Sequence, residues 1–522
     1  MRRKIFVLAA CICSVGAAHA QRGQVFGMES FPIEPMMDFS NFNYSMSTPR
    51  SSAMGGAFGS LGADLASMSI NPAGLGMYRG SEFGTTMSVM TNNMIPEATG
   101  GLEYKGNNLK TRFLLNNIGM VLNMSQSNGP VTSTQFGFGY NRLADLNYNM
   151  AFATPRDTHT VGELFAQQVT GIPSTLFEDN RNPFSNPNID PSIWGGVLAW
   201  KTFLIDNYNG IPDQYTISSL APDATKTHYS EFTSRGYVGE FTISGAMNLN
   251  NKLYLGATMS ILSISNDRYL YYEEAYPDFD PAFPDDLRLM QYQQRVSFTG
   301  GGVALKLGAI YRPIKSLRIG LAFHTPYLVG LERSYDADMA TNTHSNLNSF
   351  VSTAILHDSY SYSTPPRLMA GVSYTFGKVG LVSVDYEKVW WNGMRSQDNT
   401  RFNDMVRDYV TVNLKGQDNV RIGAEFKPTA AIALRAGATY TGSKLRSKAV
   451  LFDNPVAYRS GSVSLGAGFR LYGGYSLDLT YVYAKTDYTS YPMYSMAGVA
   501  STPDVKPYGN RSLYMLGFSS RF

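Results

Sequence analysis

The sequence contains little cysteine, little charge and no long hydrophobic run beyond its start. Its 522 residues include two cysteines, Cys11 and Cys13, and both fall in the signal peptide predicted below. We therefore expect the mature chain to have no disulfide bond, no catalytic thiol and no cysteine-bound metal. Charged residues make up 16% of the chain, whereas soluble domains have about 25%. The net charge of +3 is too small to indicate a nucleic-acid partner.

A hydrophobic run long enough for a membrane helix is also missing from the rest of the chain. No later segment approaches the stretch of about 20 apolar residues that such a helix needs. Aromatic residues are nevertheless abundant, at 13%, and there are 49 glycines. An exported chain with few charges, many aromatics and no membrane helix indicates a transmembrane β-barrel, because only every second residue of a barrel strand faces lipid.

Residues 1–20 are interpreted as a secretory signal peptide. Arg2, Arg3 and Lys4 form its basic start, an apolar run follows, and Ala18-His19-Ala20 has the form of a cleavage site. Together with the barrel pattern, this signal predicts that the protein resides in the cell outer membrane.

Residues 81–522 have the alternation of strands with two different faces. Val463, Leu465 and Phe469 share one parity, opposite Ser462 and Ser464, as in a pleated strand that is apolar on one side. The pattern predicts about fourteen strands, near 81–92, 112–125, 131–153, 234–248, 252–272, 291–313, 316–333, 360–376, 379–391, 417–427, 431–442, 459–472, 474–487 and 509–522.

The lengths of the connections distinguish a barrel from a soluble sandwich. Short turns at 249–252, 313–316, 376–380, 427–431 and 472–474 alternate with longer connections at 273–290, 334–359, 392–416, 443–458 and 488–508. Short turns at one end and long loops at the other are typical of outer-membrane barrels. The longest connection, 154–233, is expected to be an extracellular loop that is partly helical. It is interpreted as a cap on the barrel mouth, with capture of apolar substrate as the alternative.

The end of the chain supports the same fold. Tyr514, Leu516, Phe518 and Phe522 share one parity, which predicts a lipid-facing last strand with an aromatic anchor. This ending is similar to the signal read by the barrel-assembly machinery, so we expect that machinery and outer-membrane lipid to be partners.

Ahead of the strands lies a small, glycine-rich stretch from Arg50 to Arg79. It contains Gly56–Gly59, then Ala63-Asp64, then Asn71-Pro72-Ala73-Gly74-Leu75. This stretch resembles the hatch of the FadL/TodX family of outer-membrane transporters for hydrophobic compounds. The predicted fold is therefore all-β: a transmembrane antiparallel β-barrel of about 14 strands, with a lead and hatch in residues 21–80 plugging the lumen. Asn71, Pro72, Ala73 and Gly74 are the predicted hatch or gate residues.

The resemblance also implies a kink in the third strand through which cargo leaves sideways into the membrane. Gly137 and Gly139 are the candidates for this lateral-exit kink, since a glycine within a strand often marks a bulge or a close backbone approach. The alternative is that both glycines make room for the hatch.

Charged residues of the strands fall on the inward parity. They are Asp385, Glu387, Arg421, Glu425, Arg435, Arg470 and Asp478. We expect them to pair and hold the wall and the hatch together. The functional alternative is that an unpaired arginine, with Arg435 as the candidate, receives a substrate carboxylate through a bidentate contact.

Signals for chemistry are few. The sequence has no complete G-x-S-x-G, H-E-x-x-H or phosphate-binding loop, and its histidines have no ligand spacing. The acidic run from Asp278 to Asp286 has enough oxygens for Ca²⁺ but is better interpreted as a solvated loop. We therefore expect no enzyme activity, no cofactor and no metal site.

Passive outer-membrane transport of hydrophobic small molecules is the predicted function. The resemblance implies long-chain fatty acids or aromatic hydrocarbons as cargo, a hatch that shifts, and lateral exit, in a protein that is expected to be a monomer. The alternative is a partner-binding barrel of a secretion system built on the same scaffold.

Overall fold

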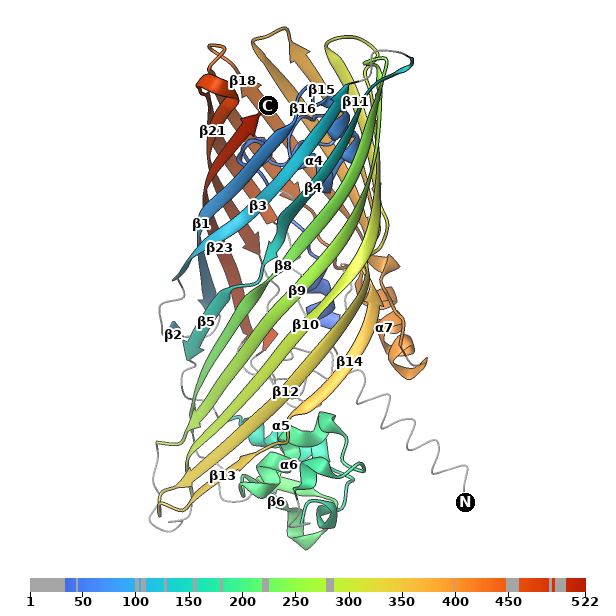
Figure 1. Ribbon diagram of the computed structural model, residues 1–522. Helices are drawn as coiled ribbons and strands as arrows, with labels where there is room; N and C mark the ends of the chain where they lie inside the picture. The colour runs from blue at the N-terminus through green and yellow to red at the C-terminus, as the bar shows by residue number, and fades with distance from the viewer. Residues whose placement is uncertain are drawn as a thin grey trace.

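The wall of the molecule is a closed antiparallel β-barrel of 14 strands (Figure 1). The computed structural model describes residues 33–43, 46–98, 103–104, 109–125, 129–153, 156, 158–178, 182–217, 225–277, 286–398, 400–446, 460–487, 491–492 and 504–522. The predicted signal peptide, residues 21–32 and most of the acidic run at 278–286 lie outside these ranges. Within them, no helix is both long enough and apolar enough to cross a membrane.

Each predicted strand segment corresponds to one strand of the wall. In chain order these are β1 (Glu82–Ala98), β3 (Leu109–Ser125), β4 with β5 (Val131–Asp145, Tyr148–Ala153), β8 (Thr227–Leu249), β9 (Leu253–Ala275), β10 (Leu287–Tyr311), β11 with β12 (Leu317–His324, Leu328–Thr343), β14 with β15 (Leu356–Ser363, Arg367–Phe376), β16 (Gly380–Trp390), β18 (Gly416–Phe426), β19 (Ile432–Thr441), β20 (Ser460–Arg470), β21 (Tyr475–Asp487) and β23 (Asp504–Arg521). Short strands β2 (Glu103–Tyr104), β13 (Asn348–Ser352), β17 (Arg395–Ser396) and β22 (Tyr491–Pro492) extend it.

The ring closes between the first and last strands. β1 pairs with β23 from Glu82, opposite Arg521, to Ala98, opposite Val505. Closure satisfies the backbone hydrogen bonds of both edges, which an open sheet in a membrane could not do. Ser81 and Phe522 exchange backbone hydrogen bonds of 2.9 and 3.0 Å at this seam, so the barrel begins and ends at the same rim. We call this rim, which carries the short turns, the short-turn end, and the opposite rim the long-loop end.

Prolines account for two breaks in the wall. β11 and β12 are separated at Pro326, and β14 and β15 at Pro365 and Pro366, where proline has no N–H to donate to the ladder. The two breaks adjoin, because Tyr327 N donates to Thr364 Oγ1 at 2.9 Å.

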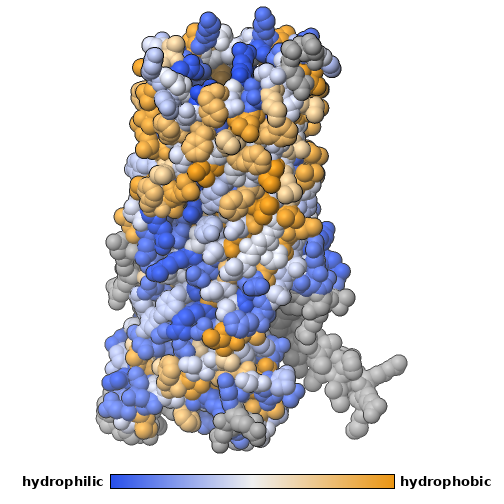
Figure 2. All heavy atoms as spheres, in the orientation of Figure 1, coloured by the Kyte–Doolittle hydropathy of each residue, from blue (hydrophilic) through white to orange (hydrophobic). Residues whose placement is uncertain are grey.

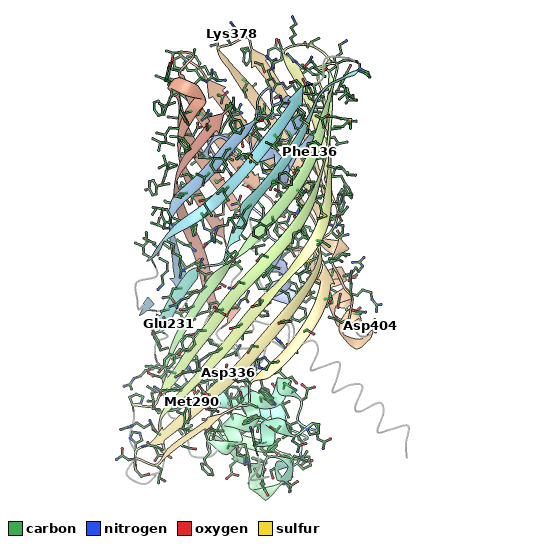
Figure 3. The ribbon with its side chains drawn as sticks, in the orientation of Figure 1. Phe136, Glu231, Met290, Asp336, Lys378 and Asp404 are labelled. Atoms are coloured by element: carbon green, nitrogen blue, oxygen red, sulfur yellow. The ribbon has the colours of Figure 1, made fainter. Side chains whose placement is uncertain are left out.

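The outer surface is apolar where the membrane is expected. Phe136, Phe241, Leu305, Val384 and Leu465 all point outward and are exposed. Figure 2 shows a largely hydrophobic band in the half nearest the short turns and a more hydrophilic surface toward the long loops. Figure 3 shows the same division: Phe136 lies within the band, while Glu231 and Asp336 lie nearer the long-loop end.

Helices and irregular segments fill the interior and cover the long-loop end. Inside lie α2 (Ile33–Phe39), α3 (Pro49–Ala53), α4 (Ser67–Ile70) and the 3-10 helix η2 (Pro72–Met77). The long connection between β5 and β8 forms a cap with α5 (Val161–Val169), η3 (Ser174–Leu176), η4 (Pro183–Ser185), η5 (Pro191–Ile193), α6 (Trp194–Lys201), β6 (Ile205–Asn207), η6 (Tyr208–Gly210) and β7 (Tyr215–Ile217). The remaining helices are η7 (Trp391–Gly393), α7 (Thr400–Asn413) and η8 (Tyr472–Gly474).

The cap packs on the inner wall through aromatic side chains. Phe165 and Tyr292 have ring centroids 5.5 Å apart, and Trp194 lies 6.0 Å from Tyr335. Thr160, which caps α5, and Val161 N both donate to the buried carboxylate of Glu274 on β9. The cap is therefore tied to the barrel by both packing and polar contacts.

Sidedness can be tested by labelling cysteines introduced at opposite rims, since the mature chain is expected to have none of its own. We expect a bulky, membrane-impermeant maleimide to label Leu347→Cys on intact cells and to label Lys378→Cys only after the outer membrane is permeabilised. Both side chains are exposed, so access decides the result. The opposite labelling pattern would reverse the orientation.

Candidate functional site

Residues 46–79, here called the hatch, fill the barrel near the short-turn end. Two side chains act as N-caps of its helical segments: Thr48 accepts from Ser51 N, and Asn71 accepts from Ala73 N. Pro49 and Pro72 stand at the first helical positions, where the missing N–H costs no hydrogen bond. Nearly all of the hatch is buried.

The predicted Asn71-Pro72-Ala73-Gly74 motif joins the hatch to itself and to the wall. Asn71 is fully buried; its Nδ2 donates to Gly59 O at 2.6 Å and to Leu321 O of β11 at 3.4 Å. Ala73 packs against Tyr254 and Ile310 of the wall. The carbonyl of Gly74 accepts from Ala63 N at 3.0 Å. These contacts assign the motif a holding role, and its role as a gate stays a prediction.

Glycines of the wall admit the hatch backbone at close range. A Cβ on Gly437 would lie 2.2 Å from Gly55 N, and one on Gly320 would lie 2.1 Å from Gly59 O. Such distances exclude any larger side chain, so the glycines form a ring of contact around the hatch. The other members of this glycine ring are Gly256, Gly308, Gly423, Gly466 and Gly517.

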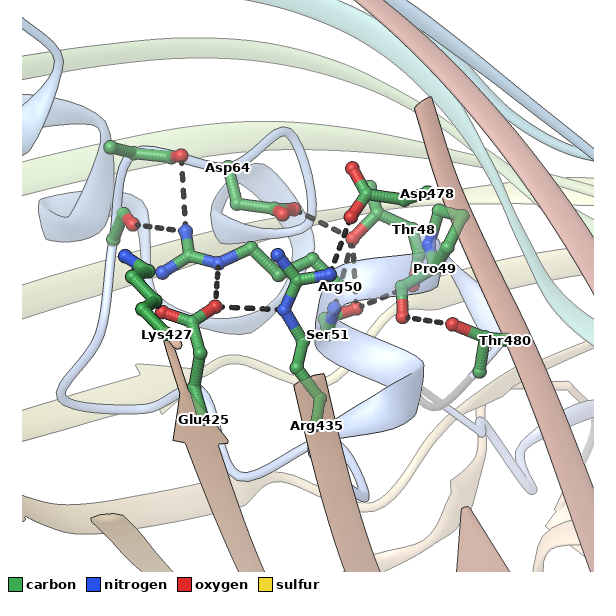
Figure 4. Close-up of polar contacts among 12 residues, drawn as sticks. Thr48, Pro49, Arg50, Ser51, Asp64, Glu425, Lys427, Arg435, Asp478 and Thr480 are labelled. Atoms are coloured by element: carbon green, nitrogen blue, oxygen red, sulfur yellow. Dashed lines mark hydrogen bonds and ion pairs between the residues drawn. The ribbon is translucent and has the colours of Figure 1, made fainter. Parts of the chain in front are cut away.

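A network of charges fastens the hatch at the short-turn end (Figure 4). Glu425 of β18 pairs with Arg50 of the hatch at 3.2 Å and with Arg435 of β19 at 2.7 Å. Arg435 also pairs with Asp478 of β21, and Lys427 with Glu425 at 3.1 Å. Burial lowers the pKa of Arg50, but Glu425 and Asp64 raise it by more, so the net pKa lies above its ordinary value and Arg50 stays charged.

Arg435, the candidate for a substrate carboxylate, is thus already bound to two carboxylates of the chain. This pairing agrees with the main expectation, that inward charges hold the wall and the hatch together. The same holds for Glu387, which accepts from Arg421 and from Asn419. A substrate role for Arg435 stays a prediction and would require displacement of Glu425 or Asp478.

A second polar centre holds the middle of the hatch. Glu240 of β8 and Lys306 of β10 form a fully buried ion pair. Glu240 also accepts from Ser69 of α4 and from Tyr327, while Lys306 donates to Ser69 O at 3.0 Å. The ring of His324 lies 3.0 Å from Ile70 O. Strand alternation places Glu240 and Lys306 on the inward parity, opposite the exposed Phe241 and Leu305, although neither is among the residues predicted above.

Residues 33–43, here called the lead segment, continue the filling toward the long-loop end. Asp38 pairs with Arg268 at 2.9 Å, and Arg367 donates to Ser40 O at 2.6 Å. The Arg367 guanidinium lies over the ring of Phe42, with Arg367 Cζ 4.7 Å from the ring centroid. Asn43 N donates to Leu143 O of β4 at 2.8 Å. The described part of the lead is therefore packed in the lumen.

The third strand is interrupted, but not at the predicted glycines. Gly137 pairs with Val121 of β3 and Ser244 of β8, and Gly139 pairs with Gly119 and Thr242. The expected unpaired backbone at these positions is therefore not observed. A Cβ on Gly137 would lie 2.9 Å from the sulfur of Met68, and one on Gly139 would lie 2.7 Å from Met68 Cε. Both glycines make room for the hatch, as the alternative expectation held.

The interruption lies further along, between β4 and β5. Pairing of β3 with β4 covers only Asn117–Ser125, so within the described wall Leu109–Leu115 have ladder partners on β1 alone, and a register shift skips Asn116. At the break, Asn147 donates through Nδ2 to Gly236 O at 2.9 Å and accepts from Gly236 N at 3.1 Å. Asn92 of β1 donates to Asn147 O at 2.9 Å. Beyond the kink the third strand thus lies beside β1, bypassing β3.

The glycine ring predicts which substitutions loosen the hatch. Gly437→Val puts side-chain atoms into the backbone of Gly55, so we expect a dislodged hatch, higher single-channel conductance and greater antibiotic sensitivity. Gly330→Val is the matched control, since a Cβ there meets nothing within 4 Å. Heat-modifiable migration in gels checks that both barrels fold. Equal conductance of the two variants would contradict the close fit.

Whether Gly139 makes room for Met68 can be tested by rescuing a larger residue at position 139 with a smaller one at position 68. Gly139→Val should lower the thermal stability of the barrel, because its side chain overlaps Met68, and adding Met68→Ala should restore part of the loss. Overpacking of this kind costs about 1–3 kcal/mol. An absence of rescue in thermal unfolding would show that Gly139 is needed for another reason.

No protein-family model matches the chain, and no curated protein sequence matches it significantly. The chain is similar to a solved structure of a Pseudomonas aeruginosa FadL homologue, at 13% identity and a TM-score of 0.54, covering 91% of this chain and 98% of that one. It is also similar to the Ralstonia pickettii toluene transporter TbuX, at 16% identity and a TM-score of 0.50, covering 92% and 99%.

A third similar structure is the CymD monoaromatic hydrocarbon channel, at 15% identity and a TM-score of 0.50, covering 92% of this chain and 99% of that one. In the described ranges, no three His, Cys, Asp or Glu side chains are grouped as metal ligands would be. The closed barrel with a filled lumen, its apolar outer band and these likenesses show that the chain has the fold of the FadL-type channels.

Proposed function

We propose that this protein is a passive outer-membrane channel for hydrophobic small molecules, such as long-chain fatty acids or aromatic hydrocarbons. The observation that carries the proposal is the interruption of the third strand between β4 and β5, which leaves part of β3 without a partner on that side. The hatch fills the straight path through the barrel beside it. The similar solved structures include a toluene transporter and a monoaromatic hydrocarbon channel, and this supports the cargo class.

The straight path through the barrel is a poor route for hydrophobic cargo. It would cross the buried Glu240–Lys306 pair and the Arg50–Glu425–Arg435 network. Removing one partner of a buried ion pair costs about 3–5 kcal/mol, so separating several together is a large barrier. Passive movement supplies no energy for that step.

The proposed side path runs past apolar side chains of the hatch and the wall toward the lipid. Met46 of the hatch packs with Met90 and Leu114 of the wall in a buried cluster beside the interruption. Asn116, which faces the same place, donates from Nδ2 to Met46 O at 3.0 Å. Backbone groups left unpaired at membrane depth cost several kcal/mol each, so the gap must be lined by protein or cargo. Cargo in transit would replace the present lining.

The lead segment is the part we expect to move. It touches the kink through Asn43 and Leu143 and joins the hatch at Met46, where the apolar lining is. Its contacts with the wall are an ion pair, a few hydrogen bonds and apolar packing, whereas residues after Thr48 are held by many buried polar groups. We propose that the lead yields to cargo while residues 48–79 stay in place.

Straightening the kink should therefore slow transport. Asn147→Val removes both hydrogen bonds to Gly236 and favours a regular strand, which would bring β5 toward β3. We expect uptake of labelled toluene or oleate by proteoliposomes to fall about tenfold or more, normalised to folded protein.

Asn149→Val on β5 is the matched control, because its side chain bonds only to the Thr233 hydroxyl and lies beyond the kink. Equal uptake by the Asn147 variant and wild type would remove the lateral route from the proposal. If wild-type protein gave no uptake above empty liposomes, the channel itself would be contradicted, and the partner-binding barrel would be the better interpretation.

A further inference from the structure

A polar cavity of about 670 Å³ opens beneath the hatch at the short-turn end. Eight cationic and four acidic side chains line it. The acids are all engaged: Glu425 and Asp478 in the network around Arg435, Glu82 with Arg521, and Asp64 with Thr48. The cavity therefore keeps an excess of positive charge after every acid has its partner.

Four of the lining arginines have no carboxylate partner among the described residues. They are Arg79, Arg312, Arg318 and Arg470. Arg312 caps the turn instead, donating from Nη2 to Lys315 O at 3.0 Å. Arg79 and Arg470 are exposed to solvent, so water can satisfy them.

Arg318 differs from the other three because its Nε is withdrawn from solvent without a hydrogen-bond partner. It lies on β11 with the same parity as Gly320, so its side chain is on the lumen side directly below the hatch. A buried donor without a partner costs free energy, and that cost is offset when an acceptor binds.

Two hydroxyl groups of the neighbouring strand β15 are also buried without a hydrogen-bond partner. Ser373 of β15 stands opposite Arg318 in the ladder, and Thr375, two residues on, lines the cavity with it. A guanidinium flanked by free hydroxyl donors matches the planar or tetrahedral oxygens of a carboxylate or a phosphate.

We propose that this cavity is an anion-binding site in which Arg318 and Thr375 hold the carboxylate or phosphate group of a molecule at the short-turn end of the hatch. Either a free organic acid or the headgroup of a lipid in the facing leaflet supplies such a group. The site lies on the far side of the hatch from the proposed lateral route, and anion binding holds whether or not the barrel transports hydrophobic cargo.

The test is calorimetric titration of the purified, folded barrel with octanoate, inorganic phosphate and octanol at low salt. We expect octanoate and phosphate to bind and octanol, which has no charge, to bind at least tenfold more weakly than octanoate. Arg318→Gln should weaken binding of the anions about tenfold or more. Thr375→Val, which keeps the shape of the side chain, should weaken it severalfold and serves if the arginine variant does not fold.

Lys378→Gln is the control for net charge, because it removes one cation from the same rim outside the cavity and should leave binding within twofold. Raising the salt concentration should weaken binding. Unchanged anion affinity in both the Arg318 and Thr375 variants would overturn the proposal, as would octanol binding as well as octanoate.

Nanodiscs distinguish the two sources of the anion. If a lipid headgroup is the occupant, octanoate should bind more weakly in phosphatidylglycerol discs than in phosphatidylcholine discs, and Arg318→Gln should abolish the difference. If a soluble acid is the occupant, the affinity should be the same in both discs and still fall in the variant. A difference that persists in the variant would place anion binding elsewhere.

Discussion

Backbone hydrogen bonding around a closed ring is the constraint on which the rest of this structure depends. Lipid offers no partner for a free N–H or C=O, so β1 must meet β23, as it does over their whole described length. Because unpaired backbone is costly in lipid, the place where strand pairing fails needs an explanation. Between β3 and β5 the third strand turns toward β1, and Met46 and Asn116 lie at that point. A gap that is costly when empty is a natural position for an exit that cargo fills.

Fit between hatch and wall follows from two further requirements. The hatch backbone approaches so closely that glycine is the residue that fits at Gly320 and Gly437. A fully buried charge costs several kcal/mol unless it is paired or hydrogen-bonded, and the fully buried Glu240 and Lys306 meet that need in each other. Together these contacts fix the register of the hatch and make it part of the wall. Under the proposed function, the lead segment is the part that moves.

Much of the fold could be predicted from local pattern, whereas the site depends on contacts between distant residues. Alternation such as Val463 and Leu465 on one face survives in the structure because lipid and lumen select different side chains. Glycine in a strand has two explanations, a kink or room for a neighbour, and the sequence could not choose between them at Gly139. The kink is made by Asn147, through hydrogen bonds to partners 55 and 89 residues away in the chain. The sequence also could not show that Arg435 pairs with Glu425 and Asp478.

The central claim is that cargo leaves sideways while the hatch stays fixed, and a disulfide between hatch and wall tests it most directly. The Ser464 hydroxyl on β20 donates to Ala53 O at 3.0 Å, so Ala53→Cys with Ser464→Cys brings two thiols close together for a disulfide without placing a side chain at a ring glycine. Uptake of labelled toluene or oleate is measured in proteoliposomes before and after oxidation. The account predicts equal uptake by the oxidised and reduced protein. Uptake that stops on oxidation and returns with a reductant would contradict it, because cargo would then have to pass the hatch.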